Sequence, residues 1–335
     1  MRRGKISESV LKRSVLKRIK THREEVINGA GVGTDCAVLS LQDGYEMVLA
    51  TAPVSAPAGE LSMYAVSMAL NNVAATGAEP VGVLLAVLLP EGVPESDLQK
   101  IMEQAESVCG VCGAEIMGGH TEVTAAVCEP VMSVTGVGKR CAGQAEPMTG
   151  VRAGQDVVIS KWIGLEGTIR LARAHREELC TRYPARMIEE AAALDRYLSV
   201  IPEAATAVKS GVCGMHDVSR GGIFGALWEL AQRAGVGLEI DLKKIPVKQE
   251  TIEICEFYGL NPYELLSGGC LIMTARDGAA LVAALAREDI PAVVVGRTTD
   301  GNDRILYNEE EKRYLDKPKE DQIYQVYLQN EPVNP

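Results

Sequence analysis

Four short segments of the chain combine glycines or small residues with polar side chains that can bind phosphate or a metal ion. They share one design: the end of a strand, then glycine or small residues, then polar groups. Glycine has no side chain, so backbone N–H groups at such corners can approach phosphate oxygens closely. We therefore predict a site for a phosphate-bearing nucleotide, built from Gly31-Val-Gly33-Thr-Asp35, Asn71-Asn72, Gly118-Gly-His-Thr-Glu122 and His216-Asp217-Val-Ser-Arg-Gly221-Gly222.

Two features of these segments strengthen the prediction. A helix that begins at Gly221-Gly222 would add the positive end of its dipole, which attracts anions. Asp35 and Asp217 offer carboxylate oxygens, the ligands that Mg²⁺ prefers when it bridges phosphates.

Taken singly, each segment has a structural alternative that the sequence leaves open. A glycine pair is often an ordinary turn, Asp35 can bond its own backbone in a turn, and His216 can be a buried structural histidine. The run Gly29-x-Gly31-x-Gly33 lacks a preceding strand and the spacing of a dinucleotide-binding loop. No lysine-containing phosphate loop of the Walker type is present.

The composition limits the class of protein. A chain of 335 residues with 47% hydrophobic residues predicts two globular domains, and a change of composition near Cys141 to Gly154 suggests domains at 1–145 and 150–335. The net charge of −11 argues against a nucleic-acid partner. We expect no signal peptide, because no apolar signal region is seen, and no membrane partner, because the longest apolar run (Val81 to Leu89) is short. The nine cysteines have no framework spacing, which predicts reduced thiols in a cytoplasmic protein.

Two local features of the sequence each have two possible interpretations. The basic stretch from Arg2 to Arg23 is either a solvated face of an N-terminal helix or an arm that closes over a polyphosphate. Cys109 and Cys112 form a lone C-x-x-C pair, which is either a pair of ordinary thiols or a metal or redox site. Both features together could also form a partner-binding surface.

The periodicity of apolar residues predicts mixed helices and strands whose alternation is too irregular for a doubly wound sheet, so we expect an α+β fold in both domains. We expect the last thirty or so residues, which are rich in charge, to be peripheral. The predicted strands are 36–41, 47–51, 81–89, 114–117, 127–137, 156–160, 212–215, 237–240, 270–274 and 292–295. The predicted helices are 6–19, 61–75, 94–108, 165–179, 185–198, 203–210, 221–234, 248–258 and 278–287.

As a set, the glycine segments resemble the superfamily of aminoimidazole ribonucleotide (AIR) synthetase, which includes hydrogenase maturation proteins of the carbamoyl-dehydrating step. The likeness is closest to the hydrogenase-maturation-factor-like, AIR-synthase-related branch and covers about residues 5 to 300. The matching stretches are Gly31 to Val38, Asn71 to Pro80, Gly118 to Thr124, Lys161 to Gly167, Met215 to Gly222 and Leu265 to Cys270.

The resemblance implies a homodimer in which N-terminal domains pair to close a β-barrel, and a C-terminal α/β sandwich-like domain. It also implies ATP and Mg²⁺, used to activate an amide or acyl oxygen or to transfer a phosphoryl group to a small molecule or protein thiol. On this basis we assign His120 and Glu122 as acid or base, and Asp35, Asp217 and Asn72 to metal. Nucleotide-binding residues would be Gly31, Gly33, Asp35, Asn72, Gly118, Gly119, Thr121, His216, Gly221 and Gly222.

The sequence departs from the family pattern at four places. Ala52 stands where an Asp is usual, Asn71-Asn72 replaces an Asn-Asp pair, and His120 replaces the Asp that several relatives carry. Two metal carboxylates are thereby lost, which predicts a weakened Mg²⁺ site. The last cysteine is Cys270, so the chain lacks the C-terminal cysteine that carries the group being dehydrated.

Two hypotheses follow from the resemblance and these departures. The first is an ATP-dependent enzyme that acts on a small substrate or protein group. The second is a catalytically degenerate paralogue that binds a nucleotide as a sensor or assembly partner.

Overall fold

A computed structural model describes residues 8, 12, 26–28, 31–34, 37–40, 44–317 and 319–329. The chain divides into two compact units, one of Lys20–Glu146 and one of Met1–Ile19 with Pro147–Pro335. These are the N-terminal unit and the C-terminal unit, respectively. The predicted helix 6–19 (apart from Glu8 and Lys12) and the predicted metal ligand Asp35 lie outside the described residues.

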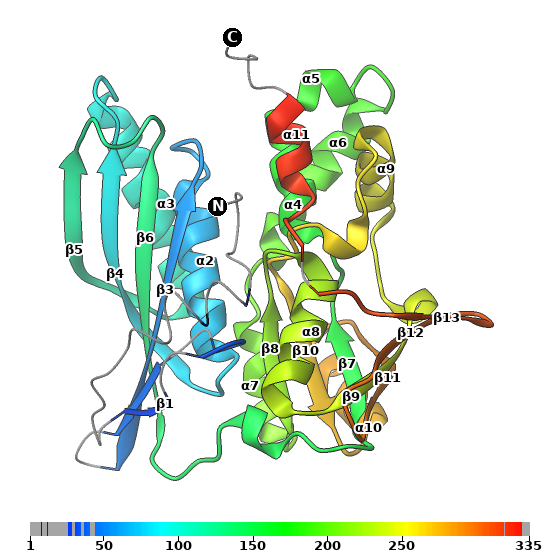
Figure 1. The fold of residues 1–335 in the computed structure, drawn as a ribbon. Coiled ribbons are helices and arrows are strands. Elements are labelled where there is room, and N and C mark those ends of the chain that lie inside the picture. The colour runs from blue at the N-terminus through cyan, green and yellow to red at the C-terminus, as the bar shows by residue number, and fades with distance from the viewer. Residues whose placement is uncertain are drawn as a thin grey trace. The chain divides into compact units, whose positions relative to one another are not determined.

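The N-terminal unit is a mixed sheet with two helices on one of its faces (Figure 1). The strand order is β1-β2-β3-β6-β4-β5, and β4 and β5 are the parallel pair because α3 connects them. Its elements are β1 (Val26–Asn28), β2 (Ala37–Ser40), β3 (Tyr45–Ser55), α2 (Leu61–Ala74), β4 (Glu79–Leu89), α3 (Glu95–Cys112), β5 (Glu115–Val123) and β6 (Val131–Cys141).

Close packing of α2 on the sheet explains the small residues predicted for that helix. Ala65 and Ala69 are fully buried. A Cβ atom at Gly138 of β6 would lie 2.4 Å from Cγ1 of Val73, so glycine there makes room for the helix. Alternate residues of β3 are buried beneath α2, among them Ala52, which is 3% exposed.

The motif Gly118 to Glu122 differs from the prediction. We expected a strand that ends at Met117, but β5 continues through the motif to Val123 as an edge strand beside β4. Gly119 has φ +150°, and a Cβ atom there would lie 1.9 Å from the carbonyl oxygen of Leu85. The diglycine thus follows an irregularity of β5 itself, where Met117 is an extra residue between those paired with Val83 and Leu84 of β4. Sequence periodicity does not show this need for glycine.

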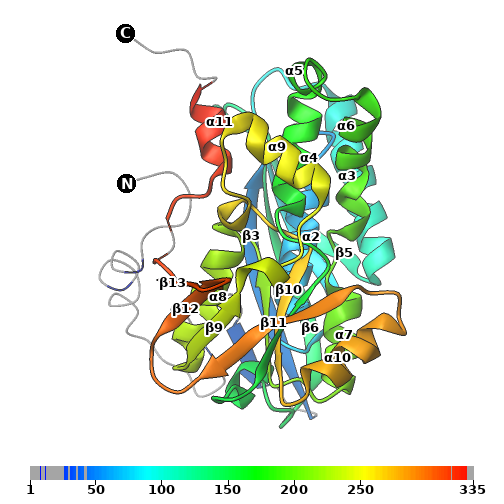
Figure 2. The same ribbon diagram turned by 90° about the vertical axis from the view of Figure 1, so that its right-hand side faces the viewer.

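The C-terminal unit contains a seven-stranded sheet of order β13-β12-β9-β11-β7-β10-β8. The helices α4, α5, α6 and α9 gather beyond one end of this sheet (Figure 2). The strands are β7 (Asp156–Ser160), β8 (Gly214–Val218), β9 (Gly237–Asp241), β10 (Cys270–Ala275), β11 (Ala292–Thr299), β12 (Arg304–Asn308) and β13 (Glu311–Tyr314). The helices are α4 (Leu165–Ala174), α5 (Arg176–Leu179), α6 (Ala185–Ala192), α7 (Ile201–Lys209), α8 (Gly222–Ala234), α9 (Gln249–Tyr258), α10 (Gly278–Ala286) and α11 (Ile323–Gln329). Short 3₁₀ turns are η3 (Pro147–Gly150), η4 (Ala193–Tyr197), η5 (Leu242–Lys244) and η6 (Pro262–Glu264).

Two aliphatic cores stabilise this unit. One lies between α8 and the sheet and includes Ile159, Ile223 and Leu227, all fully buried. The other joins α4, α6, α9 and α11 through residues such as Leu171 and Ile254. None of the helices in the described part of the chain is long and apolar enough to cross a membrane.

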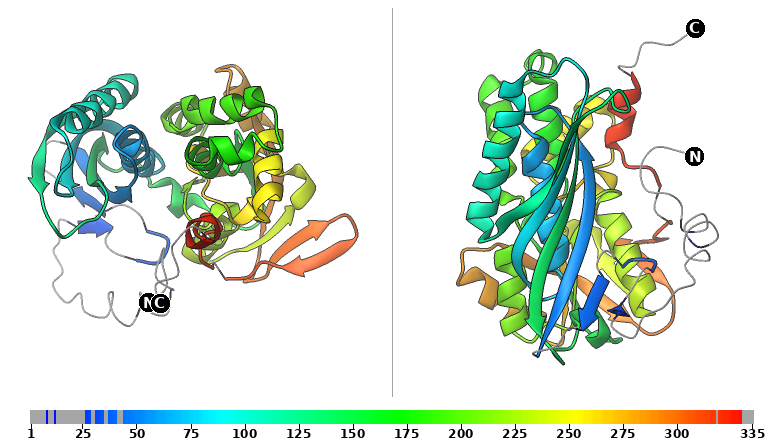
Figure 3. Two further views of the ribbon diagram at one scale, coloured as in Figure 1. Left: turned by 90° about the horizontal axis from the view of Figure 1, so that it is seen from above. Right: turned by 90° about the vertical axis from the view of Figure 1, so that its left-hand side faces the viewer.

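The α+β class predicted from the sequence is confirmed. The chief error concerns the last thirty residues, which we expected to be peripheral. They form β13 and α11 (Figure 3), and Leu315, Asp321, Ile323 and Val326 are buried. Because this segment is rich in charged residues, its few buried side chains were not recognised in the sequence.

We predict that Gly119→Ala lowers the free energy of unfolding by about 2–4 kcal/mol, because the methyl group overlaps a backbone oxygen and alanine disfavours this φ. Gly110→Ala is the control, since a Cβ atom there meets nothing within 4 Å and the residue lies inside α3. It should leave stability unchanged or raise it by up to about 1 kcal/mol. Urea unfolding followed by circular dichroism measures both, and equal stability of the two variants would contradict this account.

Candidate functional site

The predicted residues of the C-terminal unit lie on β8 and at the corner that follows it. His216 and Asp217 are 6% and 5% exposed on this edge strand. His216 Nε2 lies 3.1 Å from Oε2 of Glu229 on α8. Because side chains alternate along a strand, Asp217 points to the opposite face of the sheet. His216 is therefore held by a structural contact, while Asp217 is a carboxylate buried at the end of the strand.

The corner itself requires its two glycines. Gly221 and Gly222 have φ +84° and +61°, and a Cβ atom at Gly222 would lie 2.4 Å from the carbonyl oxygen of Tyr263. The chain turns here into α8, whose N-terminal N–H groups carry partial positive charge. This geometry matches the predicted glycine corner and helix start.

The N–H group of Gly221 already has an anionic partner within the chain. It donates a hydrogen bond of 2.7 Å to Oδ2 of Asp321, a residue 100 positions away. Oδ1 of Asp321 accepts from the backbone N–H groups of Leu266 and Ile323 at 3.2 and 3.0 Å. One carboxylate thus joins the glycine corner, the Leu265–Ser267 loop and the start of α11.

Burial perturbs the ionisation of this carboxylate. Asp321 is 4% exposed, and desolvation raises its pKa to about 6, although the three N–H donors act in the other direction. We did not identify Asp321 from the sequence. The available signal was local: an Asp just before an apolar helical run is a common N-cap, and Asp321 accepts from Ile323 in that way.

The predicted catalytic pair of the N-terminal unit lies on β5. His120 and Glu122 are in register with Ala86 and Leu88 of β4, and their side chains are 69% and 54% exposed. His120 Nε2 and Glu122 Oε2 are 3.4 Å apart. The pair can therefore reach a molecule in solution, with Glu122 able to orient the imidazole ring. Gly118, Gly119 and Thr121 of the same motif build the strand that carries them.

The other predicted residues of this unit lie elsewhere. Gly31 and Thr34 bridge a tight turn in which Gly33 has φ +67°, consistent with the turn alternative. Asn72 lies partly buried on α2 and makes polar contacts there.

No metal cluster is evident in the part of the chain that the structure describes, where no three His, Cys, Asp or Glu side chains converge. Cys109 of the C-x-x-C pair is fully buried in α3, and burial raises its pKa to about 11. A protonated thiol is a poor metal ligand and nucleophile, which favours the ordinary-thiol interpretation.

The raised pKa of Asp321 makes the stability of the protein depend on pH. The folded state binds the proton of Asp321 more tightly than the unfolded chain does. Its contribution to the free energy of unfolding is therefore complete below about pH 4 and is lost as the pH rises to about 6. Its size is about 3 kcal/mol for a shift of about two pH units. We predict that Asp321→Asn flattens the dependence of the unfolding free energy on pH between 4 and 6.

Urea unfolding at several pH values measures this slope. Asp303→Asn is the matched control, since Asp303 is exposed, and it should keep the slope of the parent protein. An Asp321→Asn variant with the same slope as the parent would show that this carboxylate does not titrate as described.

Comparison with known proteins assigns the family. The model of the AIR synthase related protein, N-terminal domain, matches residues 33–140, and that of the C-terminal domain matches residues 152–308. The carbamoyl dehydratase HypE of Cupriavidus necator is 31% identical over 262 residues, which cover 76% of this chain and 72% of that protein. HypE in complex with ATP superimposes with a TM-score of 0.71 at 21% identity, covering 96% of this chain and 97% of that one. HypE in the HypE–HypF complex gives a TM-score of 0.71 at 24% identity, with coverage of 86% and 94%. The chain belongs to the AIR synthase related family and is similar to HypE hydrogenase maturation proteins.

Proposed function

We propose that this protein binds ATP and uses it to activate an amide or acyl oxygen, or to transfer a phosphoryl group, in a reaction like that of hydrogenase maturation. The observation that carries the proposal is the glycine corner before α8, with the buried Asp217 beside it, in a chain similar to HypE. A relative of the same fold is known as a complex with ATP. The substrate is a small molecule or a protein group.

The proposed roles follow from the position of each residue. Gly222 and the first turn of α8 offer backbone N–H groups and the helix dipole to the phosphates, and Asp217 would offer its carboxylate to a Mg²⁺ ion bound with them. His120 exchanges a proton with the substrate, and Glu122 orients its ring. Catalysis of this kind depends mainly on positioning and charge neutralisation.

The described residues do not by themselves make a Mg²⁺ site. They supply one carboxylate, Asp217, and one amide, Asn72, from different units, and Ala52 is apolar and buried. A tight site would need further oxygen ligands such as Asp35, which lies outside the described residues.

The alternative of a degenerate sensor gains no support from the relative reported above, which is named for an enzyme. The route through a cysteine-bound group is not open to Cys270. This thiol is fully buried on β10, and burial raises its pKa to about 12.

Pairing of two copies through the N-terminal sheet is the second part of the proposal. No helix among the described residues covers the face of this sheet opposite α2 and α3, and Leu84 on β4 is 42% exposed. The edge strand β5 is exposed along most of its length. An apolar face beside an unpaired edge favours association with a second sheet. The neighbour in complex with HypF makes a further protein partner plausible for this chain as well.

We predict that calorimetric titration with ATP and Mg²⁺ shows binding, and that Asp217→Asn weakens it at least ten-fold. Asp289→Asn serves as the control, because Asp289 is exposed and its φ of 57° suits asparagine as well as aspartate. Absence of heat with ATP, ADP and AMP alike would remove the nucleotide proposal. Equal affinity of parent and Asp217→Asn would remove this residue from the site.

We predict that light scattering after gel filtration gives twice the mass of one chain, and that Leu84→Glu halves it by placing a charge on the apolar face. Val111→Glu is the matched control, since Val111 is 85% exposed on α3, away from that face. A parent protein of single-chain mass would contradict the dimer. If Val111→Glu dissociates the dimer and Leu84→Glu does not, the pairing face is wrong.

A further inference from the structure

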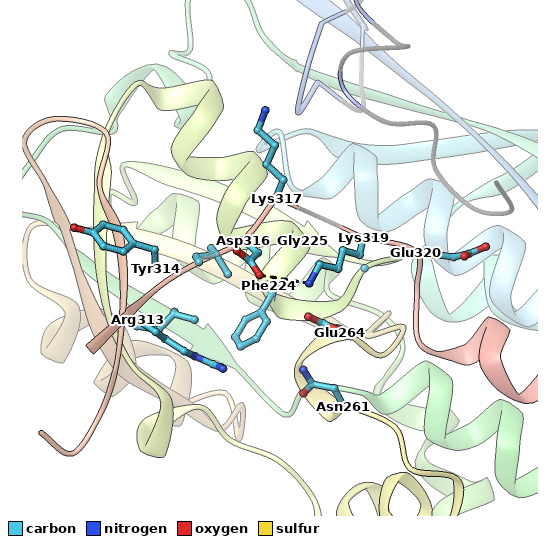
Figure 4. A pocket seen from close by; sticks show the side chains of 13 residues that line it. Phe224, Gly225, Asn261, Glu264, Arg313, Tyr314, Asp316, Lys317, Lys319 and Glu320 are labelled. Atoms are coloured by element: carbon cyan, nitrogen blue, oxygen red, sulfur yellow. Dashed lines mark hydrogen bonds and ion pairs between the residues drawn. The ribbon is translucent and has the colours of Figure 1, made fainter. Parts of the chain in front are cut away.

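A cavity of about 260 Å³ lies within the C-terminal unit, beside the first turn of α8 (Figure 4). It is bounded by α8, the η6 turn (Pro262–Glu264), the β12–β13 hairpin and the segment that follows β13. Gly221 is its only lining residue that also belongs to the nucleotide site predicted above. The lining residues are Gly221, Phe224, Gly225, Asn261, Glu264, Leu306, Arg313, Tyr314, Leu315, Asp316, Lys317, Lys319 and Glu320.

The wall formed by α8 is bare backbone at two positions. A Cβ atom at Gly225 would meet only the carbonyl oxygen of Arg220, at 3.5 Å, and one at Gly221 only Cα of Gly225, at 3.8 Å. Packing within the fold therefore leaves room for a side chain at Gly225. Glycine there lets a bound molecule approach the positive end of the helix.

Some charged side chains of the cavity already have a partner among the described residues, and others do not. Lys319 pairs with Asp316 at 3.4 Å, and Glu264 accepts a hydrogen bond of 3.0 Å from Gln322. Arg313 forms no ion pair with any residue that the structure describes, and its guanidinium lies 5.5 Å from the ring of Phe224. Within the described part of the chain, no carboxylate therefore neutralises this cation.

Three polar groups converge on the cavity from different elements. Figure 4 shows Arg313, Asn261 and Glu264 around the ring of Phe224. The ring of Phe224 is stacked on Tyr263, with 5.1 Å between ring centroids and 7° between planes. Phe224 is thus a fixed apolar floor, and the polar groups above it supply a cation, an amide and a carboxylate.

The outer wall of the cavity is anchored at both ends. The backbone N–H of Leu315 donates to the carbonyl oxygen of Arg304 at 2.8 Å, and Asp321 holds the other end through its three backbone contacts. A wall fixed in this way loses little conformational freedom when a ligand binds.

We propose that this cavity binds a small organic anion, a carboxylate or a phosphate ester, with its charge on Arg313 and its body over Phe224. The volume is below the 300–1,000 Å³ or so of typical ligand pockets, so the ligand is smaller than a nucleotide. Asn261 and Glu264 add hydrogen bonds to hydroxyl or amino groups of the ligand. This site shares the first turn of α8 with the proposed ATP site but takes its charge on Arg313, and it does not depend on ATP binding.

The test uses the full chain and ligand-observed NMR with inorganic phosphate, glycerol 3-phosphate and malate, and with glycerol as the uncharged probe. We expect at least one anion to bind and glycerol not to bind. Binding of malate alone identifies a carboxylate site, and binding of a phosphate probe alone identifies a phosphate site. If no anion binds, or if glycerol binds as tightly as the anions, the proposal fails.

Two variants locate the binding. Arg313→Gln should weaken it at least ten-fold, whereas Arg297→Gln, which removes an exposed guanidinium paired with Glu239 at 2.7 Å, should not. Gly225→Ala should weaken it several-fold while the melting temperature stays equal or rises, because alanine favours the helix. Parent-like affinity in both Arg313→Gln and Gly225→Ala would overturn the assignment.

A last variant separates this site from the nucleotide site. Asp217→Asn should leave anion binding unchanged. If Asp217→Asn abolishes anion binding and Arg313→Gln does not, the anion occupies the nucleotide site instead and the cavity is not the site.

Discussion

Contact between backbone segments, made possible by glycine, is the constraint on which both units of this protein depend. In the N-terminal unit, β5 can follow β4 only because Gly119 brings its Cα against the carbonyl oxygen of Leu85. In the C-terminal unit, α8 can start beneath the η6 turn only because Gly222 leaves space for the carbonyl oxygen of Tyr263. These are the same glycines that the sequence suggests for phosphate contact. A glycine that permits close approach of backbone inside the fold also leaves backbone exposed at the edge of a site, so the two roles are compatible.

The buried carboxylate of Asp321 decides how the glycine corner is used. An anion is stabilised where backbone N–H groups converge at the start of a helix, and here the chain supplies that anion itself. The N–H of Gly221 is thereby satisfied, and the part of the corner left for a nucleotide is Gly222 and the first turn of α8. The same carboxylate fixes the segment after β13 as a wall, which creates the cavity beside Arg313. One interaction therefore shapes both candidate sites of the C-terminal unit.

The two proposed ligands place different demands on the chain. ATP requires charge neutralisation, and the described residues offer helix dipole and backbone but few metal ligands, since Ala52 and Asn72 stand where the family resemblance implies carboxylates for Mg²⁺. A small organic anion requires one accessible cation in a cavity of matching size, which Arg313 provides. A protein of this family that activates one molecule with another needs sites for both, and the two proposals together are consistent with that requirement.

Local patterns in the sequence determined much of this fold. The apolar run of β4, the small residues of α2 and the glycine corner before α8 are local patterns, so they were predicted close to their observed bounds. The strand before that corner was placed at 212–215, whereas β8 spans Gly214–Val218 and contains His216 and Asp217. The position of β5 was not predicted, because the need for glycine at Gly119 arises from the close approach of the Leu85 backbone in a neighbouring strand. The contact between Gly221 and Asp321 joins residues 100 positions apart, and the cavity beside α8 takes its walls from four separate segments. Periodicity reports which face of one element is buried, whereas a pairing between distant residues exists only after the chain has folded, and so only the tertiary structure decided these features.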